Sequence, residues 1–73
     1  MIQLENNKLK ISFNREFYTK NSIIQSLKDF NEICSGSLEE NPEYFFVELI
    51  PNEKINNKIL GFEFCNYCLS LIK

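Results

Sequence analysis

The chain has 73 residues, 44% of them hydrophobic, and a formal net charge of −2. This size and composition predict one small folded domain and exclude a long disordered chain. The acidic balance argues against nucleic acid as a partner, because phosphate binding needs clustered Lys and Arg. No stretch reaches the roughly 18 apolar residues that a membrane-spanning helix needs, so we expect no membrane partner.

Polar and apolar residues alternate at the start of the chain. The alternation over Leu9–Phe13 predicts a half-buried strand. Ile2 and Leu4 continue the alternation upstream, and Asn6 and Asn7 between the two segments tolerate a tight turn. Two interpretations therefore stay open: a hairpin that begins near residue 2, or a single strand over residues 9–13.

An amphipathic helix is predicted next. Thr19 is a suitable N-cap, because its hydroxyl can accept a hydrogen bond from a backbone N–H of the first turn. Apolar residues then recur at helical spacing at Ile23, Leu27, Phe30 and Cys34. Gly36 is the expected C-terminal cap of this helix of about four turns.

A polar segment and a second strand follow. Ser35 to Pro42 contains Gly and Pro among polar residues, which predicts a loop. Tyr44–Ile50 is rich in aromatic and β-branched residues, so it is predicted to be a strand that Pro51 ends. The polar residues 52–58 connect it to the last element.

The last segment, Ile59–Lys73, is predicted to be a helix with apolar residues over most of its circumference. One apolar stripe contains Ile59, Phe62, Cys65, Leu69 and Ile72. The neighbouring stripe contains Leu60, Phe64, Tyr67 and Leu71. A helix this apolar must be covered on more than one side, so we expect it to carry a partner surface or a self-association surface. Alternation over Leu60–Phe64 leaves a strand as the alternative there.

Together the elements predict an α+β fold: a small two-layer domain over residues 1–73 in the order strand (or hairpin)–helix–strand–helix. The helices would pack on a two- to three-stranded sheet, and the order also permits a right-handed parallel crossover. So small a sheet leaves edges exposed, which a homodimer through an edge or the last helix would cover. An exposed edge at Tyr44–Ile50 would alternatively accept an extended peptide.

Residues suited to catalysis are scarce. The chain has no His, which is the commonest general base, and its two Gly are too far apart for a phosphate-binding loop. We therefore expect no enzymatic activity, no catalytic residues and no cofactor. An odd number of cysteines, with no signal peptide at the start of the chain, predicts a cytoplasmic protein with reduced thiols.

Cys65 and Cys68 form the one chemically suggestive pattern, a CxxC. Such a pair can act as a redox thiol or supply two ligands to zinc or an iron–sulfur cluster. Cys34 is the only other thiol, and no second pair exists. The simpler interpretation is that both cysteines are small apolar residues of the core, and the thiol or metal protein remains the alternative function.

Several segments resemble HxsD-like proteins, the small proteins of His-Xaa-Ser peptide maturation systems. Glu63-Phe64-x-Asn66 is similar to that family's EFxN stretch, and the order of elements around residues 17–19 and 46–51 is similar too. HxsD-like proteins accompany radical SAM enzymes that modify ribosomally synthesised peptides, and they are accessory proteins. Here Cys65 and Cys68 replace expected aliphatic residues, and Lys73 alone stands for the basic residues that often follow the last helix.

The resemblance implies a bacterial accessory protein that binds a maturation enzyme or its precursor peptide. We expect this partner to bind at the last helix. Phe64, Tyr67 and Leu71 are the predicted anchors, and Glu63 and Asn66 are the predicted polar pair that fixes the register of the contact.

Overall fold

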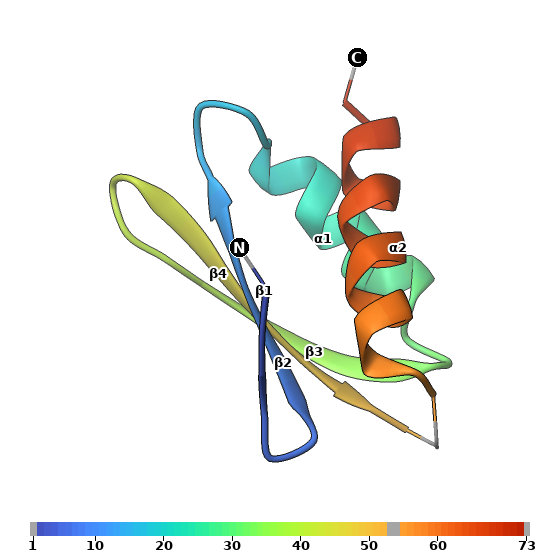
Figure 1. Ribbon diagram of the computed structural model, residues 1–73. Helices are drawn as coiled ribbons and strands as arrows, with labels where there is room; N and C mark the ends of the chain where they lie inside the picture. Colours follow the sequence, from blue (N-terminus) through green and yellow to red (C-terminus); the bar gives the residue numbers. More distant parts are fainter. Residues whose placement is uncertain (1, 53–54, 73) are drawn as a thin grey trace.

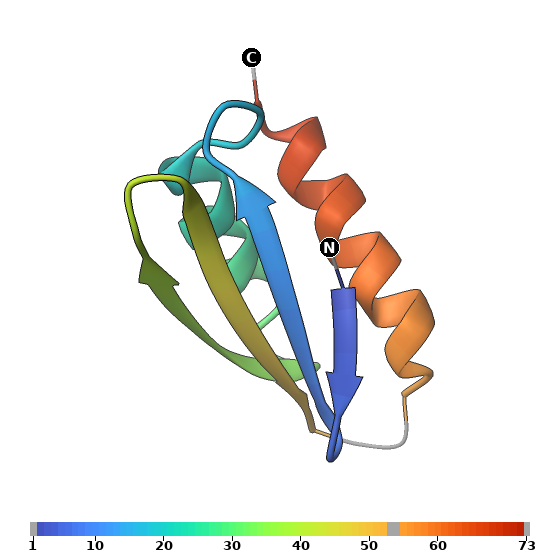
Figure 2. The same ribbon diagram turned by 60° about the vertical axis from the view of Figure 1, so that its left-hand side comes forward.

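The computed structural model describes residues 2–52 and 55–72, which form a four-stranded sheet and two helices (Figure 1). Their order is β1 (Ile2–Glu5), β2 (Lys8–Asn14), α1 (Lys20–Asp29), β3 (Cys34–Glu40), β4 (Tyr44–Pro51) and α2 (Asn57–Ser70). Both helices cover the same face of the sheet and leave the other face open (Figures 1 and 2). The predicted α+β fold is confirmed, although the sheet has more strands than the two or three expected.

β1 and β2 form the hairpin that the first alternation allows. They pair antiparallel, with Leu4 opposite Leu9. Asn6 and Asn7 connect them, and both have positive φ angles, 48° and 65°. Positive φ at both residues of a two-residue turn is the type I′ requirement, and Asn adopts this conformation more readily than most residues. The turn therefore suits its sequence, and β1 lies at the edge of the sheet.

The strands lie in the order β1-β2-β4-β3, and every neighbouring pair is antiparallel. In the described part of the chain no two strands pair in parallel, so the parallel crossover that the element order permits is not present. β2 and β4 are central, whereas β1 and β3 are the two edges. The hypothesis that Tyr44–Ile50 offers an exposed edge to a peptide is therefore wrong, because β4 pairs with β2 on one side and with β3 on the other.

The predictions for the end of α1 and for the segment after it are wrong. Thr19 is the N-cap, as predicted, and its Oγ1 accepts a hydrogen bond from the Ser22 N–H at 3.1 Å. The helix ends at Asp29 instead of Gly36, and most of the predicted loop Ser35–Pro42 belongs to the edge strand β3. Main-chain pairing with β4 holds β3 in place, and a polar sequence does not reveal such pairing.

Gly36 is a site of close packing and not a helix cap. It lies opposite Leu49 in the sheet and beneath α1, where an added Cβ would be 2.3 Å from Cδ2 of Leu27. The end of the Leu27 side chain fills the space that a Cβ would need, so α1 packs directly on the edge strand at this point.

The core lies between the helices and the inner face of the sheet. Its buried apolar residues are Leu9, Ile11, Phe13, Ile23, Cys34, Phe45, Val47, Leu49, Leu60, Phe64 and Cys68. Phe64 is fully buried, and its ring centroid lies 6.2 Å from that of Phe13 and 5.2 Å from that of Phe30. It thus joins residues from β2, α2 and the end of α1 in one aromatic cluster.

α2 confirms the helix predicted for the last segment, and the strand alternative over Leu60–Phe64 is wrong. The side chain of Asn56 caps its first turn by accepting hydrogen bonds from the N–H groups of Lys58 and Ile59, at 3.0 and 3.1 Å. α2 ends at Ser70, and Lys73 lies outside the described residues. The helix runs beside β1 and contacts both β1 and β2 (Figure 2).

We predict that Phe64→Ala lowers the free energy of unfolding by about 3–5 kcal/mol, because it removes a fully buried ring and leaves a cavity. Urea denaturation followed by circular dichroism measures this change. Phe62→Ala is the matched control on the same helix: its ring is 55% exposed, and the expected loss is about 0.5 kcal/mol or less. Equal losses for the two variants would contradict the packing of α2.

Candidate functional site

α2 has two apolar sides, and the sheet and α1 together cover one of them. Its inner side, with Phe64 and Cys68, is buried. On the other side Ile59, Phe62 and Leu69 are each about half exposed, and we call these three residues the outer stripe. Exposed apolar residues that share one side of a helix commonly mark an interaction surface.

The predicted anchors lie on the inner side. Phe64 belongs to the core, so a partner cannot reach its ring. Tyr67 is half-buried, and its hydroxyl donates a hydrogen bond to the carboxylate of Asp29 in α1, which raises the pKa of the Tyr67 phenol. Leu71 is half-buried at the C-cap of α2. Tyr67 thus joins the two helices, and the side of α2 open to a partner is the outer stripe.

Glu63 and Asn66, the predicted polar pair, are both exposed on α2. They are therefore accessible to a partner at the outer stripe. Their role in fixing the register of such a contact stays a prediction.

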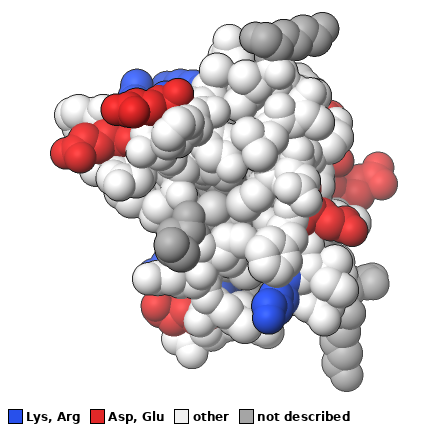
Figure 3. Space-filling model, turned by 45° about the horizontal axis from the view of Figure 1, so that its top comes forward, with Lys and Arg blue, Asp and Glu red and all other residues white. Residues whose placement is uncertain are grey.

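An apolar groove with a volume of about 560 Å³ lies between α2 and β1. Its lining residues are Ile2, Leu4, Leu9, Lys58, Phe62 and Cys65. The register of the hairpin places Ile2 and Leu4 on the face of the sheet that carries the helices, and Leu4 is 61% exposed. Figure 3 shows that the middle of one side of the molecule is largely uncharged, with acidic side chains towards its left and right margins.

Gly61 allows α2 to lie close to β1. An added Cβ at this position would be 3.2 Å from Cδ1 of Ile2, which is tighter than ordinary van der Waals contact. The helix therefore packs against Ile2, while Leu4, two residues further along the strand, stays exposed beside the groove.

β1 also directs main-chain groups off the edge of the sheet. In a hairpin with a two-residue turn, the residues that flank the turn form a hydrogen-bonded pair, and such pairs alternate along the strands. Glu5 and Lys8 flank this turn. The N–H and C=O groups of Leu4 and Ile2 therefore point away from β2, while the side chains of the same two residues line the groove.

Sequence reasoning did not identify Leu4 and Lys58 as groove residues. The alternation at the start of the chain indicated that Leu4 shares an apolar face with Ile2. It contained no signal that α2, more than 50 positions later, passes beside this strand. The groove arises from tertiary contact alone.

Cys65 and Cys68 lie in different surroundings. Cys68 is fully buried, and burial raises the pKa of its thiol to about 11. Cys65 lines the groove and is partly exposed, and burial raises the pKa of its thiol as well. Activated redox thiols need a lowered pKa. The surroundings of Cys65 and Cys68 raise the pKa instead, which does not favour the redox interpretation. In the part of the chain that the structure describes, no three Cys, Asp or Glu residues are grouped to hold a metal ion.

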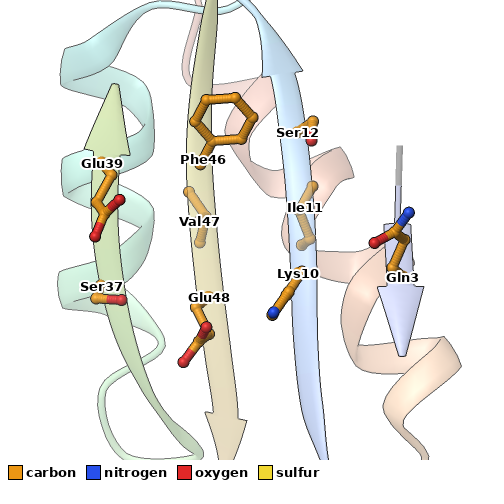
Figure 4. A pocket seen from close by; sticks show the side chains of 9 residues that line it. All are labelled: Gln3, Lys10, Ile11, Ser12, Ser37, Glu39, Phe46, Val47 and Glu48. Carbon is orange, nitrogen blue, oxygen red and sulfur yellow. The ribbon is translucent and has the colours of Figure 1, made fainter. Parts of the chain in front are cut away.

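The open face of the sheet is mostly polar. Figure 4 shows the side chains around its shallow depression, which has a volume of about 340 Å³. Lys10 forms an ion pair with Glu5 at 3.5 Å, and Lys8 forms one with Glu48 at 3.6 Å. These charges are compensated within the sheet, whereas Lys58 in the groove has no ion-pair partner among the described residues.

Comparisons with models of protein families, with curated proteins and with solved structures found no match to this chain. Among the helices in residues 2–52 and 55–72, none is long and apolar enough to cross a membrane. A functional proposal therefore depends on the geometry of the groove and on the sequence resemblance.

Cys65 is predicted to be the first thiol that iodoacetamide alkylates in the folded protein, because Cys34 and Cys68 are buried. The rate of Cys65 alkylation should rise about tenfold per pH unit near neutral pH. The raised pKa of this thiol keeps the reactive thiolate scarce, and its fraction grows about tenfold with each pH unit. Peptide mass spectrometry after brief labelling identifies the modified residue, and Cys65→Ser should abolish the early product. Rapid alkylation of Cys68 at neutral pH would contradict its burial.

Proposed function

We propose that this protein is a non-enzymatic accessory protein that binds a peptide or protein partner through the groove between β1 and α2. The groove itself carries the proposal. It combines an exposed apolar helix side with the exposed edge of a sheet, and each is a surface that proteins normally pair or cover. One partner bound in the groove would cover the apolar helix side and pair with the sheet edge at the same time.

The pathway in the proposal comes from the sequence resemblance. Glu63-Phe64-x-Asn66 resembles a stretch of HxsD-like proteins, which accompany radical SAM enzymes. In this fold Phe64 anchors the helix to the core, while Glu63 and Asn66 stay exposed close to the outer stripe. We therefore propose that the partner belongs to a system that modifies a ribosomally synthesised peptide in the bacterial cytoplasm. The protein would hold the precursor peptide for the modifying enzyme.

We propose no catalytic role for the chain. It has no His to act as a general base. The thiol at the groove, that of Cys65, has a raised pKa and is protonated at neutral pH. The chemistry of the pathway is assigned to the radical SAM enzyme.

Co-expression with a radical SAM enzyme and a precursor peptide from the same gene neighbourhood tests this proposal, with mass spectrometry of the peptide as the readout. Omitting the protein should abolish modification. Phe62→Glu should lower the modified fraction about tenfold or more, because it places a charge in an apolar contact. Phe46→Glu, on the open face, is the matched control and should leave modification unchanged. Complete modification without the protein would contradict the proposal.

A further inference from the structure

We propose that the groove binds an extended peptide segment, which adds to the sheet as a strand beside β1 and places alternate apolar side chains against Phe62 and Cys65. This inference rests on the proposed function, because it specifies how the partner binds. Three features of the same groove carry it: the main chain of β1, the apolar side chains of β1 and α2, and the charge of Lys58.

The main chain of β1 sets the conformation of the occupant. The N–H and C=O groups of Ile2 and Leu4 point off the edge of the sheet, as the alternation from the Glu5–Lys8 pair requires. An extended segment can form hydrogen bonds with all four groups. A helix cannot, because its own backbone groups are already paired within the helix. An extended peptide is therefore the occupant that completes this edge.

The same pairing places the side chains of the occupant. Residues opposite one another in an antiparallel or parallel pair project to the same face of the sheet. The occupant's residues opposite Ile2 and Leu4 therefore project to the side where α2 lies, against Phe62 and Cys65. These two residues are two positions apart in the occupant, so its sequence should carry apolar residues at i and i+2.

Lys58 adds a charge preference. It lies in the first turn of α2, where a positive charge is unfavourable because the helix dipole is positive at that end. Its side chain lines the groove with Leu4 and Leu9 and has no ion-pair partner among the described residues. An acidic side chain or a terminal carboxylate at this end of the occupant would pair with it. The favoured ligand is thus an extended peptide with alternating apolar residues and one acidic group.

A displayed library of random peptides, selected against the purified protein, tests the inference without knowledge of the natural partner. The enriched peptides should share two apolar residues two positions apart and an acidic residue beyond them. Leu4→Glu should weaken their binding about tenfold or more, whereas Gln3→Glu, on the same strand but the opposite face, should not. Leu4 is exposed, so its replacement leaves the core intact.

Two further measurements separate strand addition from other contacts. N-methylation of alternate peptide residues should abolish binding, and N-methylation of the intervening residues should not, because only one set of amides faces β1. Lys58→Glu should weaken the binding of the acidic peptides, and replacing the acidic residue of the peptide by Lys should restore binding to this variant. Both patterns are specific to the proposed geometry.

The inference is overturned if no peptide is enriched over the Phe62→Glu protein, or if the enriched peptides bind as helices or tolerate Leu4→Glu. It is also overturned if sedimentation shows a dimer that Leu4→Glu dissociates, because the occupant is then a second copy of the chain. In each case the co-expression experiment tests the proposed function independently. If modification of the precursor still depends on Phe62, the accessory role is supported and the partner binds in another way.

Discussion

α2 is apolar on two opposite sides, and the sheet and α1 together cover only one of them. Phe64, on the inner side, is fully buried and contacts aromatic rings of β2 and of the segment after α1. Gly61 lets the helix lie directly on Ile2. These contacts fix the rotation of the helix about its axis. The rotation in turn leaves Phe62 and the rest of the outer stripe facing solvent beside the edge strand.

The edge strand β1 places unpaired main-chain groups beside the exposed apolar side of α2. β1 is short, and among residues 2–52 and 55–72 no further strand pairs with its outer main-chain groups. Sheet edges of this kind attract further strands unless they are covered or charged. An apolar helix side alone would suit many partners, and a free edge alone would suit any extended chain. Their combination, with Lys58 at one end of the groove, selects for a particular class of extended peptide.

The sequence predicted the elements whose burial follows a simple period. Leu9–Phe13 and Tyr44–Ile50 alternate between a buried and an exposed face, and both are strands. β3 was missed because Ser35, Gly36 and Ser37 carry no apolar signal, and main-chain pairing with β4 holds the strand. The prediction that Phe64 is a partner anchor is wrong, because periodicity shows two apolar stripes on α2 without showing which one packs against the sheet. The groove joins segments at opposite ends of the chain, so no local pattern could predict it.

Amide hydrogen exchange, followed residue by residue by NMR, tests the binding surface most directly. The comparison is between the free protein and its complex with the precursor peptide or a selected peptide. We predict that the amide of Leu4 exchanges rapidly in the free protein and at least about tenfold more slowly in the complex, while the amides of β3 at the other edge are unchanged. Protection confined to β3, or unchanged exchange at Leu4 in a saturated complex, would contradict binding of the peptide at the β1 edge.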